Sequence, residues 1–241
     1  MKIKWLGHPA FKIVSDEGTV IYMDPWIKKN PVCPIRLDDV IKADVVTVTH
    51  GHDDHLGDAL EIVKKTGALL ISSPEICFYA QKHGIKWDKG SYSIDIGGCA
   101  TFKDIEIHAT HAVHTAAIYG EEWNNNEEMI PNGASMGYVL KLKSGKTIYY
   151  AGDTGLTMDM QLIGEIYRPD IAFLPIGGRY TMTPRLAARA AAMVGAEYII
   201  PMHYNTFPFN QQDPIELQRL IDALTARVKV VILKPGEEFE F

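Results

Sequence analysis

The chain has 241 residues, enough for one large core or two small ones, and α/β domains of this size commonly stay single. We therefore expect one domain over residues 1–241. With 46% hydrophobic and 22% charged residues, the composition is that of a globular protein and excludes a disordered or fibrous chain. The formal net charge of −6 gives no general attraction to polyanions, so we expect no nucleic-acid partner.

The N-terminal segment lacks the charged region, apolar run and cleavage site of a signal peptide. The longest apolar stretches, such as residues 171–176, fall far short of the ~20 residues that cross a bilayer, so no membrane partner is expected. The cysteines Cys33, Cys77 and Cys99 are odd in number and form no C-x-x-C pair. We expect each to be a reduced, small buried hydrophobe in a cytoplasmic protein, and the sequence leaves a homo-oligomer open.

The first part of the chain alternates short apolar runs with turn residues, which predicts a β-meander followed by a further strand. These expected strands span residues 2–6, 11–14, 19–23 and 44–49. After a histidine-rich loop, apolar residues at helical spacing predict a helix over 57–66, which Gly67 ends. A second strand and helix follow from Leu69, with Ser73 and Pro74 opening the helix.

The second half returns to strands and then alternates helices with strands. Strands are expected over 100–109, 136–143, 146–151, 171–174, 198–200 and 229–233, and helices over 158–167, 184–194 and 214–226. Ser144-Gly145 is typical of a tight hairpin turn. Strand-rich halves interleaved with helices indicate a mixed α/β fold of two packed sheets with outer helices. Residues 119–133 have no periodicity and are predicted to form a long solvated loop, with a substrate lid as the alternative.

Four ligand-type side chains lie between the fourth strand and the next helix, in the pattern H-x-H-x-D-H. His50 and His52 follow the strand end closely, so two imidazoles can converge on one ion. Asp54 and His55 come at the helix entrance, where the turning chain can aim them at a second ion. Imidazole and carboxylate ligands suit zinc, with iron or manganese as alternatives. Chance alone produces this pattern in roughly one such sequence in a thousand.

This motif resembles the signature of the metallo-β-lactamase superfamily, and the likeness extends along most of the chain. Further similar segments are Ala151-Gly152-Asp153-Thr154 and Ile200-Pro201-Met202-His203-Tyr204. Within the superfamily, the segments around His8, Asp24 and Gly177-Gly178 are similar to a largely uncharacterised group of metal-dependent hydrolases related to the L-ascorbate-6-phosphate lactonases. The resemblance implies a four-layer αββα sandwich with the metals in a cleft at one edge of its two mixed sheets.

The resemblance also implies two divalent metal ions, most simply Zn²⁺, with Mn²⁺ or Fe²⁺ as alternatives. Their implied ligands are His50, His52, Asp54, His55, His114, Asp153 and His203. Asp153 would bridge the ions, and His203 would bind the second. Both residues follow apolar strand ends, so a parallel sheet would deliver them to the same edge as His50.

The third ligand of the first metal is a choice between His114 and His111, which lie close together after one strand. His114-Thr115-Ala116 fits the related hydrolases best, because a histidine followed by small hydroxyl residues stands there, although the usual residues are serines. Asp24 is the candidate for the carboxylate that hydrogen-bonds a ligand imidazole and fixes its tautomer. The alternative is that Asp24 is only a turn residue at a strand end.

Two such ions would activate a shared water, so we expect hydrolysis of an ester, lactone or phosphodiester by a metal-bound hydroxide, with Asp54 orienting it. Arg179 follows another strand end and could clamp an anionic group of a small-molecule substrate, but it would not titrate as a proton donor. The alternatives are an iron-dependent oxidoreductase or a nuclease of the same fold, and a non-catalytic metal-binding protein. The diiron flavoproteins typically have Glu where His52 stands, which favours the hydrolase.

Overall fold

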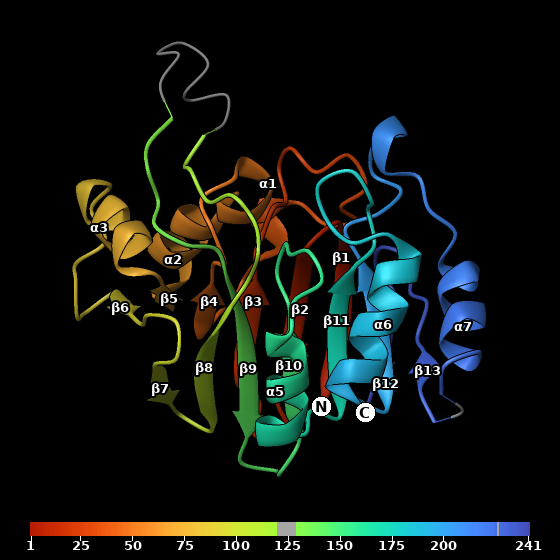
Figure 1. The fold of residues 1–241 in the computed structure, drawn as a ribbon. Helices are drawn as coiled ribbons and strands as arrows, with labels where there is room; N and C mark the ends of the chain where they lie inside the picture. Colours follow the sequence, from red (N-terminus) through yellow and green to blue (C-terminus); the bar gives the residue numbers. More distant parts are fainter. Residues whose placement is uncertain (120–128, 226) are drawn as a thin grey trace. The chain divides into compact units, whose positions relative to one another are not determined.

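The computed structural model describes residues 1–119, 129–225 and 227–241 (Figure 1). The chain forms two compact units, each with its own sheet. Unit 1 comprises Met1–Gly98, Thr115–Ala134 and Lys234–Phe241, and unit 2 comprises Cys99–His114 and Ser135–Leu233. The expectation of a single domain stays a prediction. Most of the long segment expected to be a loop or lid, residues 120–128, lies outside the described residues.

Unit 1 is built on a seven-stranded sheet of order β14-β1-β2-β3-β4-β5-β6. The strands are β1 (Lys2–Gly7), β2 (Ala10–Val14), β3 (Val20–Met23), β4 (Val45–Thr47), β5 (Leu69–Ser72), β6 (Ser91–Ser93) and β14 (Glu238–Glu240). The pairs from β14 to β3 are antiparallel, and those from β3 to β6 are parallel. The sheet is therefore mixed, as the sequence predicts.

The helices of unit 1 are short and follow the parallel strands. They are η1 (Leu37–Asp39), α1 (Asp53–Leu56), α2 (Ala59–Thr66) and α3 (Pro74–Lys82). Helix α3 begins where expected, because the Ser73 side chain accepts a hydrogen bond from Ile76 N at 3.3 Å and Pro74 occupies the first turn. Ile62 and Val63 of α2 are buried in the same apolar cluster as sheet residues such as Val46.

Unit 2 contains the second seven-stranded sheet, of order β13-β12-β11-β10-β9-β8-β7. Its strands are β7 (Cys99–Phe102), β8 (Ile105–His111), β9 (Met136–Leu142), β10 (Thr147–Tyr150), β11 (Ile171–Pro175), β12 (Tyr198–Met202) and β13 (Lys229–Val230). Strands β10 to β13 run parallel, whereas β7 to β10 pair antiparallel. The Ser144-Gly145 hairpin is confirmed between β9 and β10, with φ +92° at Gly145.

The helices of unit 2 lie beside its sheet in Figure 1. They are α5 (Asp159–Tyr167), α6 (Pro184–Val194), η2 (Pro208–Asn210) and α7 (Pro214–Asp222). Helix α6 buries alanines such as Ala187 and Ala191 and begins at Thr183, whose hydroxyl accepts from Leu186 N at 3.4 Å. Helices α5 and α6 approach closely at Gly164, where an added Cβ would lie 2.4 Å from the Val194 carbonyl oxygen.

The structure refines two local predictions. The strand region expected over 100–109 is divided into the β7–β8 hairpin, because Lys103 takes a left-handed φ of 55° at a turn that contains no glycine or proline. Asp54 and His55, expected at a helix entrance, lie in a separate one-turn helix, α1, that precedes α2. Among the helices the structure describes, none is long and apolar enough to cross a bilayer.

In both units, candidate site residues follow the carboxyl ends of parallel strands, which are neighbours in unit 1 and are separated by β11 in unit 2. In unit 1, Asp24 follows β3 and His50 comes shortly after β4. In unit 2, Asp153 follows β10 and His203 follows β12. Parallel strands deliver the residues at their carboxyl ends to one edge of the sheet, which is where α/β proteins bind ligands. Each sheet therefore gathers its own group of candidate ligands.

The three cysteines are free thiols, but they differ in exposure. Cys77 is buried, as expected, whereas Cys99 is exposed and the expectation for it is wrong. Burial raises the pKa of the Cys77 thiol to about 12 and also raises the pKa of Cys33, which is half-buried. At pH 8 only a very small fraction of Cys77 is therefore in the reactive thiolate form.

We expect Cys99 to react first with a thiol reagent at pH 8, Cys33 more slowly, and Cys77 only after unfolding. Counting labelled thiols by mass spectrometry in native protein and in denaturant checks this order. The Cys99→Ser variant is the control, because it should lose the fast phase and keep the other two. Fast native labelling of Cys77 would contradict the burial that the structure assigns to it.

Candidate metal centre

Three imidazole rings pack together after strand β4. The ring centroids of His50 and His52 lie 4.3 Å apart, and those of His50 and His55 lie 4.1 Å apart. All three side chains are buried, and His52 serves as the N-cap residue of α1, so that His55 follows within one helical turn. The unit 1 cluster, which we define as His50, His52, Asp54 and His55, thus gathers four side chains of the types that bind metals, three of them buried.

A buried carboxylate behind the rings determines which ring nitrogens carry protons. Asp24 Oδ2 lies 2.7 Å from His55 Nδ1 and 2.7 Å from Thr49 Oγ1. A carboxylate only accepts hydrogen bonds, so both of these groups donate to Asp24. The Thr49 hydroxyl then accepts from His50 Nδ1 at 2.9 Å. His50 and His55 therefore carry their protons on Nδ1 and present Nε2 as the acceptor atom, which is a tautomer that metal-binding histidines use.

Asp54 is held by a histidine from the first part of the chain. His8 Nε2 donates to Asp54 Oδ2 at 3.0 Å, and the same oxygen lies 3.9 Å from His55 Nε2. Trp5 Nε1 in turn donates to the backbone oxygen of His8 at 3.0 Å. His8 is a site residue for which the sequence offered only its position at a strand end. It fixes the Asp54 carboxylate near Nε2 of His55.

Three of these site residues adopt the left-handed backbone conformation that non-glycine residues rarely take. The φ angles are 56° at His8, 42° at Asp24 and 60° at His203. In this region Cβ crowds the following carbonyl oxygen, at a cost of about 1 to 2 kcal/mol per residue. Such residues collect where a turn must aim a functional side chain. The turns that follow β1, β3 and β12 are therefore shaped for the side chains they carry.

Unit 2 has a second cluster, which we define as His114, Asp153 and His203. Asp153 Oδ2 lies 2.9 Å from His203 Nε2 and 3.6 Å from His114 Nε2, and all three side chains are at least 92% buried. Gly177 makes room for this arrangement, because an added Cβ would lie 2.3 Å from the His203 carbonyl oxygen. Two imidazoles thus converge on one carboxylate oxygen inside unit 2.

The structure distinguishes between the two histidines that the sequence left as alternatives for the third ligand of the first metal. His114 lies beside Asp153, and the Thr154 hydroxyl accepts from Val113 N at 3.0 Å, which secures the segment that carries His114. His111 is exposed and its Nδ1 lies 2.9 Å from Asp159 Oδ2. The geometry of unit 2 therefore favours His114.

The residues in both clusters fit a metal ion. Ligand atoms that share one ion at ~2.1 Å lie about 3.0 to 3.5 Å apart at common coordination angles. The separations of 2.9 and 3.6 Å around Asp153 Oδ2 are close to that range. Neutral imidazoles and carboxylates are also the donor types that zinc, manganese and iron accept. The types of ligand atom and the orientation of the rings are therefore both compatible with a bound metal ion.

The remaining predicted site residue, Arg179, lies exposed after β11. Its guanidinium carbon is 5.1 Å from the centroid of the Tyr180 ring and 5.7 Å from that of Phe209. Such contacts hold an arginine side chain in place while its N–H groups point outward. The role of Arg179 toward a substrate stays a prediction.

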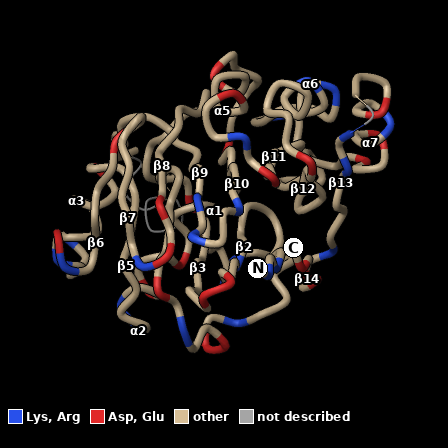
Figure 2. The backbone as a smooth tube through the Cα atoms, turned by 90° about the horizontal axis from the view of Figure 1, so that it is seen from below, with Lys and Arg blue, Asp and Glu red and all other residues tan. Residues whose placement is uncertain are grey.

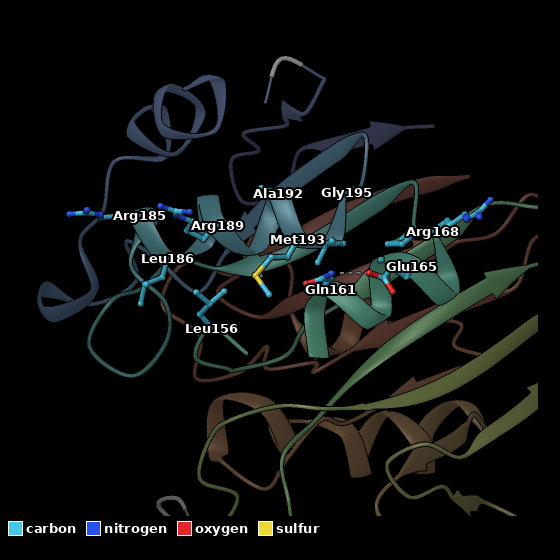
Figure 3. A pocket seen from close by; sticks show the side chains of 13 residues that line it. Leu156, Gln161, Glu165, Arg168, Arg185, Leu186, Arg189, Ala192, Met193 and Gly195 are labelled. Atoms are coloured by element: carbon cyan, nitrogen blue, oxygen red, sulfur yellow. Dashed lines mark hydrogen bonds between the residues drawn. The ribbon is translucent and has the colours of Figure 1, made fainter. Parts of the chain in front are cut away.

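A cavity of about 1070 Å³ in unit 2 does not belong to the site. It lies along α5 and α6 and contains none of the unit 2 cluster residues (Figure 3). Arg168 lies at one end, and Arg185 and Arg189 come from α6, which carries basic and no acidic residues (Figure 2). This cavity is a basic surface feature that shares no residue with the unit 1 or unit 2 cluster.

Comparison with known proteins agrees with the class that these clusters define. A sequence profile described as the beta-lactamase superfamily domain matches residues 2–203. The chain therefore belongs to the beta-lactamase superfamily, and the predicted metallo-β-lactamase fold with two mixed sheets and helices is confirmed.

Full-length relatives narrow the class further. The UPF0173 metal-dependent hydrolase of Methanopyrus kandleri is 45% identical over 240 residues, covering 100% of both chains. That of Methanobrevibacter smithii is 41% identical and covers 100% of this chain and 97% of its own. Igni18, described as a novel metallo hydrolase from the archaeon Ignicoccus hospitalis, matches at 37% identity with a TM-score of 0.85, covering 100% of this chain and 98% of that one. The protein is a metal-dependent hydrolase of this group.

Proposed function

We propose that the unit 1 and unit 2 clusters act together as one dinuclear centre that hydrolyses an ester, lactone or phosphodiester bond of a small molecule. In this proposal His50, His52 and His114 bind the first ion. Asp54, His55 and His203 bind the second, and Asp153 bridges the two. This division follows the sequence likeness to the metallo-β-lactamases. We propose Zn²⁺ as the native metal, with Mn²⁺ or Fe²⁺ as alternatives.

The observation that carries the proposal is the hydrogen-bond network of Asp24. It holds His55 directly and His50 through Thr49, and both imidazoles are left with Nε2 as the coordinating atom. A buried carboxylate that served only the fold would not need to select the tautomers of two neighbouring histidines. This network therefore supports a metal-binding role.

When bound, the metal ions supply Lewis acidity, which lowers the pKa of an attacking water and polarises the bond under attack. The chain's own residues do the positioning. Asp54, fixed at Oδ2 by His8, orients the attacking water and accepts its proton. Arg179, held over Tyr180 and Phe209, binds an anionic group of the substrate without exchanging protons. We also propose a reducing, cytoplasmic location, which the free thiols support.

The test combines elemental analysis with a substrate screen. We expect two divalent ions per chain in protein purified without chelator, and hydrolysis of at least one of a carboxylic ester, a lactone and a phosphodiester. Chelation should abolish turnover, and Zn²⁺, Mn²⁺ or Fe²⁺ should restore it. A thermal melt of the chelated protein separates loss of metal from loss of fold. Full turnover by metal-free, folded protein would contradict the proposal, as would metal-loaded protein that consumes oxygen without hydrolysing any substrate.

A further inference from the structure

Unit 1 contains a cavity of about 220 Å³ that the metal-binding residues do not use. Its wall is formed by residues 26–29, which follow β3, by the stretch of α1 and α2, by α3, and by residues 118–119. The apolar lining consists of Trp26, Leu56, Leu60, Tyr79, Ile118 and Tyr119. Aromatic and aliphatic side chains around a small concave space are typical of ligand pockets.

Two aromatic walls of this cavity contact the site. The ring centroid of Tyr119 lies 4.5 Å from that of His52, and the two residues form a β-bridge. The ring centroid of Trp26 lies 5.4 Å from that of His8, which holds Asp54. Leu56 comes from the same helical turn as Asp54, so α1 serves the cavity and the cluster together. A group inside the cavity would therefore lie beside the unit 1 cluster.

The charged residues at the cavity do not select a charged ligand. Its lining includes three lysines and three carboxylates: Lys28, Lys29, Lys64, Asp53, Asp58 and Glu61. Lys28 pairs with both Asp58 and Glu61, and Asp58 also accepts the backbone N–H groups of Ile27 and Lys28. The lysines and carboxylates balance in number, and Lys28, Asp58 and Glu61 pair with one another. The apolar side chains then determine what binds.

The volume limits the size of the ligand. An engineered apolar cavity of ~150 Å³ holds benzene, so a cavity of this size accommodates one substituted ring or a short acyl chain. A long lipid chain would extend out of it. The occupant expected from shape and charge is a neutral group with one ring or a few carbon atoms.

We propose that this cavity receives a neutral aromatic or short acyl arm of the substrate, which places the bond to be cleaved beside the unit 1 cluster. This inference rests on the proposed function and names the substrate class: small esters, lactones or phosphodiesters with one apolar arm of about one ring. Leu60 and Tyr119 are then specificity-determining residues.

Benzyl alcohol, a neutral one-ring probe, tests the cavity without any turnover. Binding is measured by titration calorimetry or ligand-observed NMR on the whole protein. We expect Leu60→Trp, which fills the cavity, to weaken binding by about tenfold or more. The matched control is Leu162→Trp at an exposed position of α5, which does not line the cavity and should leave binding unchanged. Thermal melts check that both variants fold, and Tyr119→Ala, which removes a wall, provides a second variant that should also weaken binding.

Turnover assays then link the cavity to the reaction. We expect benzyl alcohol to inhibit hydrolysis competitively, and the preference for phenylacetyl over acetyl esters to fall in Leu60→Trp. The inference would be overturned if Leu60→Trp and Leu162→Trp bound benzyl alcohol equally well, or if the unaltered protein did not bind it. Binding that does not compete with the substrate would also overturn it. If benzyl alcohol binds in the cavity but the metal-loaded protein hydrolyses nothing, the proposed function fails and the ligand cavity stands, so the two failures are distinguishable.

Discussion

Asp54→Ala is expected to lower turnover by a factor of about 10² to 10⁴, which is the range for losing a positioned proton acceptor. The carboxylate has two tasks in our proposal, as a ligand and as the group that orients the attacking water. Asp54 is the one carboxylate of the unit 1 cluster, and its Oδ2 is held by His8 Nε2 at 3.0 Å. The measurements are kcat with the best ester, lactone or phosphodiester, and the metal content of the same preparation.

The control for this prediction is Asp38→Ala. Asp38 is an exposed carboxylate of unit 1 in η1, so the variant makes the same change of charge away from both clusters and the cavity. We expect its turnover and metal content to match the unaltered protein. Undiminished turnover together with two bound ions in Asp54→Ala would contradict the assignment of Asp54.

Asp24→Asn is expected to lower metal affinity by about 10- to 100-fold, the usual effect of losing an outer-sphere partner of a ligand. Asparagine keeps the shape of the side chain but no longer offers two charged oxygens to Thr49 and His55. The His55 ring then loses the partner that selects its tautomer. Because these hydrogen bonds are buried and charge-assisted, we also expect a loss of about 1.5 to 3 kcal/mol in unfolding free energy.

The matched control here is Asp44→Asn. Asp44 also accepts a backbone N–H, from Val20 at 2.9 Å, and pairs with Lys42, but neither partner belongs to the site. Metal affinity is measured by competition with a chromophoric chelator, and stability by denaturant unfolding of the metal-free proteins. Asp44→Asn should lose stability alone. Equal metal affinity in Asp24→Asn and the unaltered protein would refute the role of Asp24.

The unit 1 cluster could be predicted from sequence because its four residues lie within six positions of each other. A strand end followed by a turn brings such residues together whatever the rest of the fold does. The same locality explains the success for the Ser73 helix start, whose cap bonds to a group three residues away. Where the local signal was weak, as at the Lys103 turn, the sequence indicated strand over residues 100–109 without locating the turn that divides it.

The partners behind the ligands are separated from them along the chain, so their contacts depend on tertiary structure. The contact between Asp24 and His55 spans 31 positions, and that between His8 and Asp54 spans 46. Strand pairing of β1, β2, β3 and β4 creates both contacts. The sequence could place Asp24 at a strand end, but no local rule distinguished a structural turn residue from a ligand partner.

The histidine motif with which the site begins is thus a property of the sequence, and so are the reaction class it indicates and the mixed α/β fold. The choice of His114 over His111 needed the tertiary structure, because His111 ends β8, His114 follows three residues later, and only the folded loop decides which ring meets Asp153. The cavity beside His52 also needed it, since its walls come from four separate segments of unit 1. Ligand identity is encoded locally by side-chain chemistry, whereas ring orientation and pocket shape arise from contacts between residues distant in the chain.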